Sequence, residues 1–351
     1  MAKIGVAVLG YAHGHVTVYS KQIMGFDDFQ LVACWDHDEQ RGRESAEQFG
    51  IAYSPHIEDV VGRDDVQLCI VGAETNRHAD CVVAAAEAGK DVILQKPMAL
   101  TLADCDRIIE AVERAGIWFS LAFQMRYDPV NIKMKELCDS GAIGRVGIVR
   151  RRHCLNLLFN PNFGKGRTAW HIDPEQNLGM WMDDASHAAD WLYWMLGEPT
   201  SVVAEIDNVL TSHAPDDTGM AIFRFRGGEM GFLFNSSVVW TSENTVEIYG
   251  DKGVIIENFG DGPSCFIPPP PGAIMLKMFQ IDKKDEGWQI IPAVIPKSQG
   301  ERIANVARNI LDEYKQGKVQ VSAREGKIST AMILGAYESA RQGRRIALPL
   351  E

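Results

Sequence analysis

The first 123 residues alternate short apolar runs with segments that can form helices, and this alternation restricts the fold more than any other feature of the chain. The apolar runs are residues 3–9, 30–35, 66–72, 91–95 and 117–123. Their hydrophobicity is continuous rather than alternating, which is typical of strands that are buried on both faces of a parallel sheet. Helices are expected between them, near 14–24, 38–49, 76–89 and 101–115. The pattern predicts a doubly wound α/β domain.

The pattern changes after about residue 124, where strands follow one another without helices between them. A helix near 129–140 and a strand near 144–153 lead into a long connection and then an apolar helix over 178–196. Further elements are expected as strands over 200–209, 217–227, 229–239, 243–249 and 253–258, and as closing helices near 300–316 and 325–342. Short turns between strands are typical of an antiparallel sheet, and the four prolines at 268–271 indicate a loop. We therefore expect two domains, 1–123 and 124–351, the second of the α+β class.

Charge and cysteine content exclude several functions. Lys and Arg number 35 against 47 Asp and Glu, a net charge of −12, which is the wrong sign for binding nucleic acid or an anionic membrane. The seven cysteines form no CxxC pair and mostly lie in apolar runs, as expected for reduced core residues of a cytoplasmic protein. No apolar stretch reaches about 18 residues without polar breaks, so we expect neither a membrane span nor a secretory signal.

The turn after the first strand is a candidate phosphate-binding turn. It reads Gly10-Tyr11-Ala12-His13-Gly14-His15, in which only the first glycine of a GxGxxG fingerprint keeps its place. Asp36 follows the second strand, 26 residues after Gly10, where an acidic side chain would accept hydrogen bonds from an adenosine ribose. Its charge would repel a 2′-phosphate, which favours NAD; the cations His37 and Arg41 keep NADP open. A helix N-cap is the alternative role for this aspartate.

Two further motifs follow strands of the same sheet. Glu74-Thr75-Asn76-Arg77-His78 comes after the third strand, and Gln95-Lys96-Pro97 after the fourth. Ligands of open parallel sheets bind at the carboxyl ends of the strands, so both motifs are placed to contact a cofactor. A lysine in a loop is usually only solvated, but at this edge we expect Lys96 to be catalytic.

The helix expected over 178–196 carries a polar stripe on an otherwise apolar surface. Asp183, His187 and Asp190 lie on one side of a helical wheel, and buried carboxylates are costly unless they are paired or face a cleft. Asp183 and His187 are spaced i, i+4, so they can hydrogen-bond or share a substrate. A structural ion pair and a zinc site completed by His153 and His171 are the alternatives; no HExxH motif or Cys set supports zinc, and we expect no metal.

Taken in order, these motifs resemble those of the Gfo/Idh/MocA family of NAD(P)-dependent oxidoreductases. The resemblance covers nearly the whole chain, from the opening IGVAVLG to the closing GRRI and LP. Its motifs are ETNRH (74–78), QKP (95–97), QMRYDP (124–129) and DDASHAAD (183–190). It implies an N-terminal dinucleotide-binding Rossmann domain and a C-terminal domain whose large open sheet supplies substrate contacts and oligomer interfaces. Gln95 and Ala185 depart from the family's usual Glu and Gly.

The resemblance implies three catalytic residues, Lys96, Asp183 and His187. We expect His187 to be the base, Lys96 to hold the substrate oxygen, and Asp183 to orient His187 or bind a hydroxyl, all beside a bound nicotinamide. Residues expected to contact the cofactor are Gly10, Ala12, His13, His15, Asp36, His37, Thr75, Asn76, His78, Gln95 and Lys96. Residues expected to contact the substrate are Arg126, Tyr127, His153, Arg167, Trp170, His171, Asp183 and His187.

The predicted function is hydride transfer between NAD and a CH–OH group of a sugar, polyol or sugar derivative, by a homodimer or homotetramer that pairs through the second sheet. Two alternatives keep the same fold. One is a glycosidase that uses NAD transiently and makes no net redox change. The other is a regulator that senses NAD(P) without catalysis, since a fold alone does not establish an activity.

Overall fold

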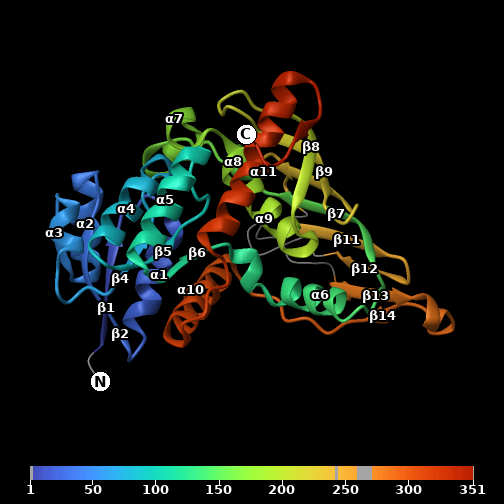
Figure 1. Cartoon of the computed structure of the whole chain (residues 1–351), viewed down its shortest axis with the longest axis horizontal. Coiled ribbons are helices and arrows are strands. Elements are labelled where there is room, and N and C mark those ends of the chain that lie inside the picture. Colours follow the sequence, from blue (N-terminus) through green and yellow to red (C-terminus); the bar gives the residue numbers. More distant parts are fainter. Residues whose placement is uncertain (1–2, 242–243, 259–270, 351) are drawn as a thin grey trace. The chain divides into compact units, whose positions relative to one another are not determined.

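The structure is a computed structural model that describes residues 3–241, 244–258 and 271–350. Its contacts divide the chain into two compact units (Figure 1). The first contains the chain up to Phe123, with Glu175–Asn177 and Ile303–Thr330, and the second contains the remainder. No helix in the described ranges is long and apolar enough to cross a membrane.

The first unit is built on a six-stranded parallel sheet in the order β3-β2-β1-β4-β5-β6, which confirms the predicted doubly wound fold. Its strands are β1 (Ile4–Leu9), β2 (Phe29–Trp35), β3 (Ala52–Ser54), β4 (Leu68–Val71), β5 (Asp91–Leu94) and β6 (Phe119–Leu121). Its helices include α1 (Gly14–Met24), α2 (Glu39–Phe49), α3 (Ile57–Val61), α4 (His78–Glu87) and α5 (Leu102–Ala115). Because β1 pairs with both β2 and β4, the strand order reverses beside it, and ligands of such sheets bind at this switch point.

Residues from the end of the chain complete the first unit. Val321 and Ala323 belong to the same buried cluster as the strands of the sheet. Tyr314, in α10 (Gln299–Gln316), donates a hydrogen bond to Asp91 at 2.8 Å, and the indole of Trp118 donates to the carbonyl of Lys318 at 2.8 Å. The next helix, α11 (Ala323–Gln342), begins in this unit and ends in the second.

The second unit contains a nine-stranded sheet in the order β14-β13-β12-β11-β7-β10-β9-β8-β15. The strands are β7 (Val146–Cys154), β8 (Pro199–Asp207), β9 (Thr218–Phe225), β10 (Met230–Ser236), β11 (Asn244–Gly250), β12 (Gly253–Glu257), β13 (Leu276–Gln280), β14 (Gln289–Ile290) and β15 (Ile346–Ala347). The pair β7–β10 is parallel and the other pairs are antiparallel, as the prediction of a mainly antiparallel sheet requires. Strands β13, β14 and β15 were not predicted, and residues 268–270 of the proline run lie outside the described residues.

Burial alternates along the strands of this sheet, so one of its faces is covered and the other is open. In β9, every second residue is buried and the residues between are exposed. Helix α9 packs against β7 and β10. The helical segments of this unit include α6 (Pro129–Asp139), α7 (Pro174–Asn177, of which Pro174 alone lies in this unit), α8 (Met180–Asp183) and α9 (Ala185–Leu196).

The prediction of one continuous helix over 178–196 is wrong. Leu178 has φ of 61°, and the segment forms two helices, α8 and α9, with Asp184 between them. The hydroxyl of Ser186 donates to the carbonyl of Asp183 at 2.8 Å, and the N–H of His187 donates to the carbonyl of Asp184 at 3.2 Å, in an i, i+3 pattern. The backbone of Asp184 stays in the right-handed helical region, with φ of −90° and ψ of −40°, so Asp183 and His187 lie on two helices that meet at a single residue rather than on one regular helix.

Candidate functional site

The turn between β1 and α1 requires glycine at its first position. Gly10 has φ of +92°, and a Cβ there would lie 2.5 Å from both the Cα and the N of Ala73, at the end of β4. The two strand ends therefore approach each other more closely than a side chain permits. His13 is the N-cap of α1, and its Nδ1 accepts a hydrogen bond from the N–H of His15 at 3.3 Å. The imidazole rings of His13 and His15 meet edge to face, with centroids 4.4 Å apart.

An ionic cluster lies at the carboxyl end of β2. The carboxylate of Asp36 is fully buried and accepts two hydrogen bonds from the guanidinium of Arg41, from Nε at 2.8 Å and from Nη2 at 2.7 Å. It also accepts the N–H of Tyr11 at 2.8 Å, which ties the end of β2 to the turn after β1. The N-cap of α2 is Asp38 and not Asp36, so the helix-capping role that the sequence left open for Asp36 belongs to Asp38.

The loops after β4 and β5 are tied together by His78. Its Nδ1 lies 2.9 Å from the carbonyl oxygen of Pro97, and its Nε2 lies 3.1 Å from that of Ala73. Burial lowers the pKa of His78 to about 4, although these carbonyl contacts act in the opposite direction. A neutral imidazole buried between backbone oxygens holds the two loops in place. The predicted contact of His78 with the cofactor stays a prediction.

The other cofactor residues expected in these loops are placed differently from one another. The hydroxyl of Thr75 donates to Asn177 at 2.7 Å, whereas Asn76 is exposed. Gln95 and Lys96 are buried at the carboxyl end of β5, and Lys96 is only 3% exposed. Neither Oε1 nor Nε2 of Gln95 has a hydrogen-bond partner within the described part of the chain. Buried amide groups without partners are uncommon, so this amide is available to a bound group.

The second unit places five of the expected substrate residues in two groups. Asp183 Oδ2 and His171 Nδ1 lie 2.7 Å apart, and the ring of His171 stacks on that of Trp170 with centroids 3.8 Å apart. The buried rings of His187 and His153 meet edge to face at 5.8 Å. The structure therefore gives Asp183 an imidazole partner that the sequence analysis did not pair with it.

The remaining expected substrate residues are placed as follows. Arg126 forms a buried, two-pronged ion pair with Asp190, with Nη2–Oδ1 at 2.7 Å and Nε–Oδ2 at 3.0 Å. Two residues of the predicted polar stripe therefore have different partners. Asp190 is bound in an ion pair, and the ring of His187 packs against the ring of His153. Tyr127 is buried and Arg167 is exposed.

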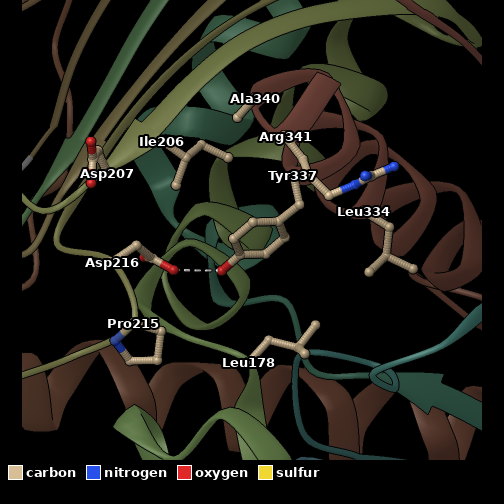
Figure 2. Close-up of a pocket in the computed structure, with 9 residues that line it drawn as sticks. All are labelled: Leu178, Ile206, Asp207, Pro215, Asp216, Leu334, Tyr337, Ala340 and Arg341. Atoms are coloured by element: carbon tan, nitrogen blue, oxygen red, sulfur yellow. Dashed lines mark hydrogen bonds between the residues drawn. The ribbon is translucent and has the colours of Figure 1, made fainter. Parts of the chain in front are cut away.

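Sequence reasoning missed three side chains that support this cluster. Asn244, from β11, has its Oδ1 3.0 Å from Nδ1 of His153. Asp216 accepts the phenolic hydrogen of Tyr337 at 2.7 Å beside a cavity of about 440 Å³ (Figure 2). Burial raises the pKa of Asp216 and the pKa of Tyr337. Two adjacent aspartates before a strand were the only sign of Asp216 in the sequence, and nothing marked Asn244 or Tyr337.

No group of three or more His, Cys, Asp or Glu side chains in the described ranges is arranged to hold a metal ion.

The sequence matches two family descriptions that together cover most of the chain. Residues 3–123 match "Oxidoreductase family, NAD-binding Rossmann fold", and residues 131–256 match "GFO/IDH/MocA C-terminal domain". The chain belongs to the GFO/IDH/MocA family of oxidoreductases. This confirms the family suggested by the motifs, and with it an NAD-binding N-terminal domain.

Several named enzymes are similar in sequence or fold to this GFO/IDH/MocA oxidoreductase. The chain is 30% identical to myo-inositol 2-dehydrogenase of Thermotoga maritima, over 72% of its own length and 74% of that enzyme. It is 27% identical to 1,5-anhydro-D-fructose reductase of Ensifer adhaerens, over 71% of its own length and 72% of that enzyme. Its fold matches levoglucosan dehydrogenase, solved with NADH and levoglucosan, with a TM-score of 0.82, 20% identity and full coverage of both chains.

The residues of the first unit fit a bound NAD. Gly10 has φ of +92°, and the tight turn that it makes after β1 is the role of the first glycine in a dinucleotide-binding fingerprint. The amide of Gln95 and one oxygen of Glu74 are buried without hydrogen-bond partners in the described residues, so polar groups are available at the ends of β4 and β5. In this oxidoreductase, the ends of β1, β4 and β5 are therefore the part of the first unit that fits the cofactor, and the individual cofactor contacts remain a prediction.

Proposed function

We propose that this oxidoreductase oxidises one CH–OH group of a cyclic polyol or sugar. The named relatives act on inositol and on anhydro sugars, and each of these names describes a ring bearing several hydroxyl groups. The second unit offers matching chemistry, because His153, His171, His187 and Asp183 supply hydrogen-bond donors and acceptors and Trp170 supplies a flat ring. Polyhydroxylated ligands are recognised by this combination.

Lys96, Asp183 and His187 are the proposed catalytic residues. When bound, nicotinamide would supply the acceptor for the hydride of the carbinol carbon, so the chain must remove the hydroxyl proton and stabilise the charge that develops on oxygen. His187 takes this proton, because imidazole is the side chain that most readily accepts and releases protons near neutral pH. Lys96 donates a hydrogen bond to the same oxygen. Asp183 accepts a hydrogen bond from a neighbouring substrate hydroxyl while it holds the imidazole of His171.

The contact between Asp183 and His171 carries this proposal. It is a carboxylate–imidazole pair in which both side chains are largely buried, and the buried His187 lies four residues beyond the end of the short helix that carries Asp183. Buried acid–base pairs of this kind are commonly found at catalytic sites.

The test is a panel of polyols and sugars, including myo-inositol and levoglucosan, each supplied with NAD or NADP and followed at the absorbance of reduced nicotinamide. We expect NADH to accumulate with at least one cyclic polyol, and we expect Lys96→Ala and His187→Asn to lose at least about a hundredfold in kcat. Release of sugar from a glycoside without NADH would favour the hydrolase instead. Binding of NAD without turnover on the whole panel would favour the sensor.

We also propose that two copies pair through the open face of the second sheet. Large apolar side chains on this face are exposed although they lie in the middle of strands: Ile148, Val203, Met220, Ile222 and Tyr249. Val203 and Ile222 face each other across β8 and β9, so these side chains form a continuous surface. Exposed apolar surfaces of this kind mark contacts between proteins, and symmetric pairing is the commonest form. Light scattering of the purified protein tests the subunit number.

A cytoplasmic location is part of the same proposal. The six cysteines in the described residues are free thiols, and five of them are buried. Reduced cysteines are typical of cytoplasmic proteins. Fractionation of cells that express the protein at its natural level tests this location.

A further inference from the structure

The carboxylate of Asp36 has no unused acceptor position in this structure. Its Oδ1 accepts hydrogen bonds from the N–H of Asp38 at 3.0 Å and from Nη2 of Arg41 at 2.7 Å. Its Oδ2 accepts from the N–H of Tyr11 at 2.8 Å and from Nε of Arg41 at 2.8 Å. A carboxylate offers about four lone-pair positions, so the protein itself fills them all. Asp36 orders the β1–α1 turn and binds Arg41, and it cannot distinguish cofactors by a further hydrogen bond unless one of these is broken.

Glu74, at the end of β4, is a second buried carboxylate in the same cluster. Its Oε1 accepts a hydrogen bond from Nη2 of Arg41 at 2.9 Å, so the two hydrogens of this nitrogen point to Glu74 and Asp36. Its Oε2 makes no hydrogen bond within the described residues and lies 3.2 Å from Nδ1 of His37. The side chains of Glu74 and Arg41 are 4% and 7% exposed. Water therefore screens this three-residue network poorly.

The cluster carries a net negative charge. Asp36 and Glu74 contribute two negative charges and Arg41 one positive charge. Burial lowers the pKa of His37, despite the opposing effect of Glu74, and so reduces the positive charge that this imidazole carries. Arg41 is thereby neutralised by its two carboxylate partners, and burial reduces the positive charge of His37; the exposed Arg77 is a further cation near His37.

We propose that Glu74 determines the preference for NAD over NADP, because it holds Arg41 between two carboxylates and leaves an excess negative charge where a 2′-phosphate would bind. Without Glu74, Asp36 and Arg41 would form a neutral pair, and one Nη2 hydrogen of Arg41 would be free to bind a phosphate oxygen. Arginine is the side chain best suited to bind phosphate in this way. The inference extends the observed NAD-binding fold and does not depend on which residues catalyse the reaction.

The test compares the binding of ADP-ribose and its 2′-phosphorylated form by isothermal titration calorimetry. Both ligands lack nicotinamide, so their affinities report the ribose site whether or not the enzyme turns over. We expect the wild type to prefer ADP-ribose, and we expect Glu74→Gln to shift the ratio of the two dissociation constants by about tenfold towards the phosphorylated ligand. Glu47→Gln makes the same charge change on the exposed face of α2 and is expected to leave the ratio unchanged.

Arg41→Gln tests the proposal in the opposite direction, and it keeps the proposal testable if Glu74→Gln does not fold. This variant leaves two carboxylates without a cation, so the ratio should move further towards ADP-ribose. The proposal is overturned if a folded Glu74→Gln shifts the ratio less than twofold, if Arg41→Gln moves it towards the phosphorylated ligand, or if the wild type prefers that ligand. If the wild type does not bind ADP-ribose, both NAD binding and this inference are overturned.

Discussion

The phenolic hydroxyl of Tyr337 donates a hydrogen bond to the carboxylate of Asp216 at 2.7 Å, and the same two side chains cap the helix that carries Asp183. Asp216 accepts the N–H of Trp181 at 2.6 Å, and the oxygen of Tyr337 accepts the N–H of Met182 at 3.2 Å. The first N–H groups of a helix have no partners within the helix itself. Helix α8 is thus held at its N-terminus by contacts from distant parts of the chain.

Tyr337→Phe is expected to destabilise the protein by about 1–3 kcal/mol, because it removes a hydrogen bond from a buried carboxylate and from a helix N–H. Urea unfolding measures this loss. Tyr249→Phe is the matched control, since Tyr249 also donates to a carboxylate, that of Glu247 at 2.7 Å, but is 38% exposed. Equal losses for the two variants would contradict a special role for the buried pair.

His171→Phe is expected to lower kcat/KM by about tenfold to a hundredfold, the range that corresponds to loss of one hydrogen bond to a charged group. The ring stays, so stacking on Trp170 is kept while the contact with Asp183 at 2.7 Å is lost. Steady-state kinetics across pH measure the effect, and a change in the shape of the pH profile separates a positioning role from general damage. His213→Phe, at an exposed position, is the control. An unchanged kcat/KM would show that His171 does not act through Asp183.

Asp190→Ala is expected to cost about 3–5 kcal/mol of stability, because it leaves the guanidinium of Arg126 buried beside the site of a lost carboxylate. The two side chains are 0% and 2% exposed, so water cannot replace the missing partner. The double variant Arg126→Met, Asp190→Leu removes both charges and should recover much of the loss. Urea denaturation of the two single variants and the double variant forms the test, and additive losses would count against a coupled pair.

The buried thiols predict how stability depends on pH. Burial raises the pKa of Cys34, Cys69 and Cys105 to about 12. These thiols keep their protons in the folded protein above pH 9, whereas the unfolded chain loses them. The free energy of unfolding should therefore fall as pH rises past about 9, by up to about 1.4 kcal/mol per pH unit for each thiol. Iodoacetamide labelling at pH 9, resolved by peptide, should spare all three until urea unfolds the protein. Rapid labelling of the native protein would contradict the raised pKa values.

The first sheet was predictable because its strands are buried on both faces and so stand out as continuous apolar runs. The same logic placed Gly10, Asp36 and Lys96 at strand ends. It failed for β3, which has only three residues. It also could not show that Arg41 would be bound by Glu74, because these residues are 33 positions apart and each was consistent with a solvated loop or helix surface.

The helix over 178–196 shows most clearly what local patterns miss. The segment is apolar over most of its surface, yet the helix is interrupted at Asp184. The groups that stabilise α8 as a separate short helix come from Asp216 and Tyr337, 35 and 155 residues from the N–H groups they accept. The residue pattern of one segment carries no information about partners from other parts of the chain. For the same reason, the contact between Asp183 and His171 was not predicted. The catalytic roles of Asp183 and His187 remain a prediction.

Transfer of a deuterium label tests the central claim most directly. The best substrate of the polyol panel, deuterated at the carbinol carbon, is incubated with NAD and the enzyme, and the nucleotide is analysed by mass spectrometry. The proposed chemistry predicts reduced nucleotide that carries one deuterium, together with a ketone product that has lost it. Consumption of the substrate with no label in the nucleotide and no accumulation of NADH would contradict hydride transfer as the function of this chain.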